Sequence, residues 1–275
     1  MKLKGFFIFN FAFFILLVSC GGNGEKGILD PKSEFALEGT IQGGAGQRLW
    51  LEEMTPDGSS FVDSIPLDEN GNFRYSHKLP YRSLYNLHST DNDYVVLLPD
   101  LGETVNVQGQ WGQLSLSYSV SGSPESVLLW QMQEFYNDGS WALKDIVDTA
   151  NRYDSLLTFK AITQKQYDAK KAVTDSIYRT LFVEQQEYIC RFIEENKGSL
   201  ATLIALYKPF NTRALIDPRD PGSIDYYDMI LDGLQEKLPD NPHTLKFKNT
   251  TEHLRSALAR QEEVAASQAA GQEKK

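Results

Sequence analysis

Cysteine is the side chain in this sequence with the most distinctive chemistry, and the 275-residue chain contains two, Cys20 and Cys190. Thiol–disulfide exchange needs a low-pKa thiolate and a second thiol close by, and the chain has no Cys-x-x-Cys motif. Cys190 could act as a lone thiol activated by Arg191, but its surroundings favour a small residue packed in a helix bundle. The cysteines therefore predict no thiol-exchange activity.

Other catalytic patterns are also missing from the sequence. The four histidines do not have a His-Glu-x-x-His or comparable ligand spacing; they are His77, His88, His243 and His253. The glycine-rich stretch 43–46 lacks the Lys-Ser/Thr ending of a phosphate loop, and no Gly-x-Ser-x-Gly elbow is present. We therefore expect a protein that is not an enzyme and that holds no cofactor and no metal.

Two weaker binding signals involve aromatic and acidic residues. Trp50 and Trp111 could stack on a sugar ring, although aromatic residues are also common within small sheets. The stretches 91–93 and 217–221 offer the oxygen ligands that calcium prefers, but Asp, Asn and Pro more often form turns. Glycan binding through Trp50 and Trp111 is therefore one alternative function.

The N-terminus predicts export and lipidation. Lys2 and Lys4 precede an apolar run from Phe6 to Val18, which would form about 20 Å of helix against roughly 30 Å of bilayer hydrocarbon. This run is too short for a membrane span and is typical of a secretory signal. The order Leu17-Val18-Ser19-Cys20 is that of a bacterial lipobox, so we predict removal of residues 1–19 and acylation of Cys20, with palmitate among the chains.

The residues after the lipobox predict a tether and a cellular location. Residues 20–33 are rich in glycine and should form a flexible linker. Only Glu25 and Asp30 stand near the cysteine, which favours an outer-membrane anchor facing the periplasm of a Gram-negative envelope. Without Lys2 and Lys4 the chain keeps 25 basic and 37 acidic side chains, a net charge of about −12 that disfavours nucleic acid as a partner.

Residues 34–122 show a period-two apolar pattern that is broken by turn residues, which predicts about eight short strands. Within it, Phe61–Leu79 reads as a hairpin around Asn70-Gly71, and Leu114 to Val120 reads as a strand. Short strands at even spacing indicate an antiparallel sandwich or barrel.

The pattern changes to helical spacing at residue 123. Ser123-Pro124-Glu125 is a helix start, and Thr163 to Gln166 fits a capping box. We expect an α-helical domain over residues 123–260 and a disordered tail over 261–275. The predicted fold class is thus α+β, with a β-sandwich or barrel-like domain followed by helices.

This order of parts resembles the N-terminal domain of unknown function and helical spacer that precede the thioredoxin domain in TlpA-like thiol-disulfide interchange lipoproteins. The residues that carry the resemblance are the Phe35 to Ile41 strand, Asp63-Ser64-Ile65, Asn70-Gly71-Asn72-Phe73, Val120-Ser121-Gly122-Ser123, Glu195-Asn196 before Gly198-Ser199, and Pro239 to Thr244.

The resemblance implies a role without the activity. The thioredoxin domain of such proteins carries Trp-Cys-x-x-Cys, and this sequence has no counterpart. We therefore predict a membrane-anchored lipoprotein with a non-catalytic binding or scaffolding role. The alternatives are an accessory that docks a separate thioredoxin-like oxidoreductase and a glycan-binding lipoprotein.

Overall fold

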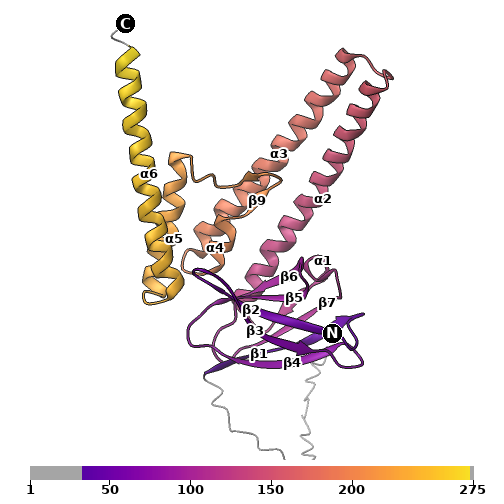
Figure 1. Ribbon diagram of the computed structural model, residues 1–275, viewed down its shortest axis with the longest axis vertical. Coiled ribbons are helices and arrows are strands. Elements are labelled where there is room, and N and C mark those ends of the chain that lie inside the picture. Colours follow the sequence, from indigo (N-terminus) through magenta and orange to yellow (C-terminus); the bar gives the residue numbers. More distant parts are fainter. Residues whose placement is uncertain (1–32, 273–275) are drawn as a thin grey trace, which may run out of the picture. The chain divides into compact units, whose positions relative to one another are not determined.

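Strands fill the first part of the computed structural model, which describes residues 33–272 (Figure 1). The strands are β1 (Glu34–Gln42), β2 (Arg48–Thr55), β3 (Gly58–Pro66), β4 (Asn72–Lys78), β5 (Leu84–Thr90), β6 (Asp93–Leu97), β7 (Thr104–Gln110) and β8 (Ser119–Ser121). They form two four-stranded sheets, in the orders β4-β1-β7-β8 and β3-β2-β5-β6.

The two sheets share a buried core, which makes this region a β-sandwich. Phe35 of one sheet packs on Tyr85 of the other with ring centroids 5.0 Å apart, and both side chains are fully buried. The alternation seen in the sequence points every second side chain into this core; examples are Leu37, Leu49, Leu51, Leu87, Val105 and Val107.

One strand pair differs from the predicted antiparallel arrangement. β1 pairs with β4 in the antiparallel sense but with β7 in the parallel sense, so its sheet is mixed. Apolar alternation is the same in either sense, and the sequence pattern therefore could not distinguish them.

The predicted hairpin over Phe61–Leu79 is wrong. A tight turn is present, since the N–H of Gly71 donates to the carbonyl of Asp68 and the Asp68 carboxylate accepts from the N–H of Asn72 at 2.8 Å. The strands on either side of this turn, however, lie in different sheets, because β3 pairs with β2 and β4 pairs with β1. The turn residues thus direct the chain across the sandwich.

The predicted strand from Leu114 to Val120 is also wrong over its first half. Residues Leu114–Ser117 form a short helix, α1, and only Ser119–Ser121 join a sheet as β8. The carboxylate of Asp93 accepts hydrogen bonds from the backbone N–H groups of Leu114 (2.7 Å) and Ser115 (2.9 Å). Hydrogen bonds to Asp93 of β6 therefore stabilise a helical turn here, although the alternating apolar pattern of the sequence predicts a strand.

The rest of the described chain is mainly helical. Its elements are α2 (Pro124–Thr158), α3 (Gln164–Asn196), α4 (Ala201–Leu206), β9 (Pro209–Phe210), β10 (Arg213–Ala214), η1 (Pro221–Ser223), α5 (Ile224–Lys237) and α6 (Pro242–Gln272). The long helices α2 and α3 pack side by side (Figure 1). Two predicted starts are confirmed, because Ser123 caps α2 and Thr163 forms a capping box with Gln166 at α3.

Helix α6 continues beyond the predicted end at residue 260. Residues 261–272, predicted as part of a disordered tail, are helical, whereas 273–275 lie outside the described residues. The stretch has alanine, glutamine and glutamate, which favour helix, and contains no proline. The sequence prediction gave too much weight to the loss of apolar residues there.

The outer face of the β3-β2-β5-β6 sheet packs on the helices. Leu84 and Leu98 belong to the same buried cluster as Leu129, Ile193 and Leu206, away from the core between the sheets. Sandwich and helices accordingly fall within one compact unit, Pro31–Lys275. No helix in residues 33–272 combines the length and apolarity needed to cross a bilayer.

Candidate ligand-binding cleft and polar junction

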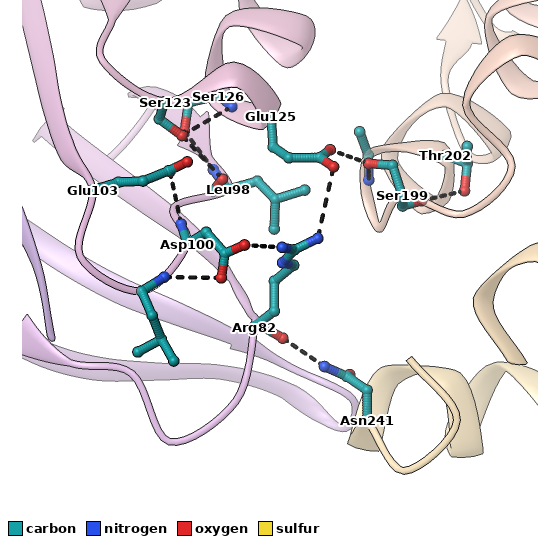
Figure 2. Close-up of polar contacts among 12 residues, drawn as sticks. Arg82, Leu98, Asp100, Glu103, Ser123, Glu125, Ser126, Ser199, Thr202 and Asn241 are labelled. Carbon is teal, nitrogen blue, oxygen red and sulfur yellow. Dashed lines mark hydrogen bonds and ion pairs between the residues drawn. The ribbon is translucent and has the colours of Figure 1, made fainter. Parts of the chain in front are cut away.

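A polar junction centred on Arg82 joins the sandwich to the helices (Figure 2). The Arg82 guanidinium contacts the Asp100 carboxylate and lies 3.7 Å from the Glu125 carboxylate at the start of α2. Asp100 is itself fixed in place, because its backbone N–H donates a hydrogen bond to the Glu103 carboxylate at 2.8 Å. The guanidinium is partly buried, so the loop before β5, the loop before β7 and α2 are tied at one point.

The same junction fixes the start of α4. The hydroxyl of Ser199 donates to the second carboxylate oxygen of Glu125 and accepts from the N–H of Ala201 at 3.0 Å (Figure 2). The hydroxyl of Thr202 donates to the Ser199 carbonyl at 2.7 Å. Glu125 therefore couples α2 to α4 while it also pairs with Arg82.

Helix α6 is attached to this loop as well. The side-chain amide of Asn241 donates to the Arg82 carbonyl at 2.7 Å, and its oxygen accepts from the N–H of His243. The His243 ring lies 3.2 Å from the Ser83 hydroxyl, and burial lowers the pKa of this histidine. Three helices are thus held in place over one sheet.

Between that sheet and the helices lies a cleft of about 500 Å³. Its floor comes from β2, β5 and β6, and its walls come from α1, α2, α4 and the residues after α4. The lining residues are Met54, Asn86, Asn92, Tyr94, Val95, Val96, Ser115, Tyr118, Leu129, Met132, Gln133, Leu203, Ile204, Tyr207, Lys208 and Pro209. A second hollow of about 240 Å³, near α6, shares Met54, Leu203, Ile204 and Tyr207 with the cleft.

Lys208 supplies a positive charge to the cleft. Its ammonium donates to the side-chain oxygen of Gln133 at 2.6 Å and lies 4.5 Å from the centroid of the Tyr136 ring. Burial lowers the pKa of Lys208 to about 8. Within residues 33–272, no carboxylate forms an ion pair with this ammonium.

Asn86 contributes a free acceptor to the floor of the cleft. Its side-chain oxygen is buried and has no hydrogen-bond partner among the described residues. A buried acceptor without a donor costs about 1–3 kcal/mol, and a bound molecule with an N–H or O–H group would recover part of that cost. The cleft lining therefore combines one cation, one buried acceptor without a donor, and apolar walls.

The two tryptophans predicted to stack on sugar pack against different neighbours. Trp50 is half-buried on β2 and stacks on His88, with centroids 5.4 Å apart and planes at 7°. His88 also contacts Tyr94, which is 43 % exposed. Trp111 is half-buried after β7 and packs against the core of the sandwich.

The remaining candidate residues that the structure describes do not come together as a site. Cys20 lies outside the described residues. Cys190 is half-buried, and burial raises the pKa of its thiol. Asp217 binds the Arg219 guanidinium through both oxygens, which lowers the pKa of Asp217 to about 2. Nowhere in residues 33–272 do three His, Cys, Asp or Glu side chains gather to hold a metal ion.

Comparison with known families matches the first part of the described chain. Residues 35–129 are similar to a domain of unknown function, DUF4369. This match covers the sandwich and the first turns of α2. No curated protein matches the chain.

Sequence reasoning missed the residues of the cleft and the junction. Gln133 and Lys208 are 75 residues apart, and Arg82 and Asn241 are 159 residues apart. Neither pair belongs to a local motif. The available signal was Lys208 itself, a lysine two residues after the end of the apolar helix α4 and directly before Pro209-Phe210.

Proposed function

We propose that this protein is a non-catalytic, ligand-binding lipoprotein of the cell envelope. The cleft between the β3-β2-β5-β6 sheet and helices α2 and α4 is its binding site. One observation carries the proposal: apolar side chains surround the cleft, while Lys208, Gln133 and Asn86 place a few polar atoms in it. Sites for small molecules commonly have 300–1,000 Å³ and this mixture of lining residues.

The junction at Arg82 supports a binding role because it holds the walls of the cleft in place. Glu125 links the starts of α2 and α4, and Arg82 links both to the sandwich. A site whose walls are already fixed loses less conformational entropy when it binds a ligand. The polar side chains that line the cleft are one ammonium, amides, phenols and a serine hydroxyl, which suit hydrogen bonding and charge pairing.

Attachment to the membrane through acylated Cys20 completes the proposal. The tether over residues 20–33 would let the binding domain stand off an outer membrane on its periplasmic side. As a relative of the region that precedes thioredoxin domains, the protein would supply binding without redox chemistry. Docking of a separate thioredoxin-like oxidoreductase stays a prediction.

One observation supports glycan binding as a second candidate function. The row formed by Trp50, His88 and Tyr94 runs across three adjacent strands, and Tyr94 also lines the cleft. A sugar would need the exposed edge of this row. A saturable change in tryptophan fluorescence with an oligosaccharide, lost in Trp50→Phe, would favour this second function.

The test of the proposed function uses N-phenyl-1-naphthylamine, a neutral apolar dye whose emission rises in apolar sites. We expect saturable binding by the full chain and at least tenfold weaker binding by Leu203→Trp, which fills the cleft from α4. Leu245→Trp is the matched control, because Leu245 is 53 % exposed and does not line the cleft. Equal binding by all three proteins, or no binding by any, would contradict the proposal.

A further inference from the structure

We infer that the ligand of the cleft is an amphipathic monocarboxylate: a carboxylate that pairs with Lys208, joined to an apolar body and to an N–H or O–H donor that reaches Asn86. The inference rests on the proposed function, since it names the class of molecule that the same cleft takes.

The ammonium of Lys208 has hydrogen-bonding capacity left over. It carries three N–H donors, and in the described chain its acceptor is Gln133 at 2.6 Å, with the Tyr136 ring 4.5 Å from the nitrogen. Gln133 is neutral and the ring offers only its electron-rich face, so neither cancels the charge. A partly buried ammonium without a counter-charge is costly, and a ligand anion would remove that cost.

Among the residues that the structure describes, no carboxylate lines the cleft. The titratable side chains that line the cleft, apart from Lys208, are the phenols of Tyr94, Tyr118 and Tyr207. Burial raises the pKa of both Tyr118 and Tyr207, which keeps these phenols neutral. The site is therefore cationic, although the chain as a whole has a net charge of −10.

A single lysine favours a monoanion over a phosphate. Phosphate groups carry up to two charges and are usually held by bidentate arginine or by several backbone N–H groups. The cleft lining has one lysine and no arginine. A carboxylate matches this donor set, and the neighbouring apolar side chains, among them Met132, Leu203 and Ile204, match an apolar body.

Asn86 adds a requirement for a donor. Its buried side-chain oxygen accepts no hydrogen bond, although Lys208 and the side-chain amides that line the cleft carry N–H donors. An amide N–H or a hydroxyl on the ligand would satisfy this oxygen. An acylated amino acid carries all three groups: a carboxylate, an N–H and an apolar chain.

The probes are N-octanoylglycine and its neutral carboxamide, which differ only in the charged group. Isothermal titration calorimetry with the full chain should show at least tenfold tighter binding of the acid. Lys208→Met should reduce this preference to less than twofold, and Lys208→Arg should keep most of it. Lys144→Met is the control, because Lys144 is exposed on α2 and does not line the cleft.

A second readout does not depend on any variant. Since the pKa of Lys208 is about 8, much of the amine is neutral at pH 8.5, and pairing with a carboxylate raises its pKa. Binding of the acid at this pH should take up a proton, measured from heats in buffers of different ionisation enthalpy. Binding of the carboxamide should take up none.

The possible outcomes separate the inference from the proposed function. If acid and carboxamide bind equally, or only the dye binds, the carboxylate assignment fails and the cleft remains a binding site. An acid preference that survives in Lys208→Met also overturns the assignment. If neither the two probes nor the dye binds, both the carboxylate assignment and the proposed function fail. If Lys208→Met does not fold, proton uptake by the wild-type chain decides.

Discussion

The ammonium of Lys208 donates a 2.6 Å hydrogen bond to the side-chain oxygen of Gln133, which lies on α2, 75 residues earlier in the chain. This contact holds a charged amine between a helix and the segment after α4 instead of releasing it to solvent. A protein that only needed stability would gain from an apolar side chain there. Under the proposed function, a bound anion would offset the cost of burying this amine.

Replacing Lys208 with methionine should stabilise the fold at neutral pH by about 1 kcal/mol, because the desolvation of the amine disappears. The folded-state pKa of about 8 lies below the unfolded value of about 10.5. Below pH 8 the amine is charged in both states and its burial cost is complete; as pH rises from 8 towards 10.5, the cost fades and stability rises.

Urea denaturation at pH 7, 8.5 and 9.5 checks this prediction. The stability difference between Lys208→Met and wild type should shrink steadily with pH. Lys144→Met, at an exposed position of α2, should leave the wild-type pH dependence unchanged. A variant that is less stable than wild type at pH 7 would show that the amine stabilises the fold.

Replacing Arg82 with methionine should destabilise the protein by about 2–3 kcal/mol. The change leaves the carboxylates of Asp100 and Glu125 partly buried without their cation. Arg219→Met serves as the comparison, because Arg219 also pairs with an aspartate but is 84 % exposed, and it should have little effect. Thermal unfolding followed by circular dichroism measures both; equal losses would argue against a special role for the junction.

Asp93 should contribute more to the stability of the fold than the nearby Asp91. Burial raises the pKa of Asp93, but hydrogen bonds from Ser89, Ser115 and Leu114 outweigh burial and leave the pKa below its usual range. Asp93→Asn should cost about 2 kcal/mol at pH 7, because one amide oxygen cannot serve all these donors. The exposed Asp91→Asn should cost little.

The pH dependence of Asp93 follows from the direction of its pKa shift. The folded-state value lies below the unfolded one, so the carboxylate contributes its full stability above the unfolded pKa. That contribution disappears as pH falls through the folded pKa. The stability gap between wild type and Asp93→Asn should therefore narrow below about pH 4, and a gap of constant size would refute this explanation.

Gly71 and Gly46 form a matched pair for testing the turn between the sheets. Both have positive φ, 78° and 70°, but a Cβ on Gly71 would lie 2.3 Å from the carbonyl oxygen of Ile41, whereas a Cβ on Gly46 meets nothing within 4 Å. Gly46→Ala should cost about 1 kcal/mol and Gly71→Ala at least about 2 kcal/mol more. Chemical denaturation of both variants measures the difference.

Local sequence patterns predicted where helices and turns occur better than they predicted which strands pair with each other. Ser123 and Thr163 cap helices as expected, since capping depends on residues within one turn. Asn70-Gly71 gave the expected turn but not the expected hairpin, because the partner of β3 is set by the sandwich as a whole. Likewise, Asp93 turns the alternating stretch from Leu114 into a helix through a contact from β6.

The candidate site could not be predicted from local sequence patterns either, because tertiary packing brings its residues together. Lys208, Gln133 and Asn86 come from the segment after α4, from α2 and from β5, and share no spacing that the sequence could reveal. Trp50 was noticed for its residue type, yet its face stacks on His88 and its position depends on strand register. Residue types can be read along a chain, but which of them face one cleft is decided by packing.

The similarity to the domain of unknown function ends at residue 129, inside α2, which runs from Pro124 to Thr158. Leu84 and Leu98 of the sandwich are buried by helical residues beyond that point. A fragment cut at this boundary would leave an apolar sheet face open to water, where strands of separate molecules could associate. The boundary drawn by sequence similarity is thus not a place to divide the protein, and the sandwich should unfold together with its helices in one transition.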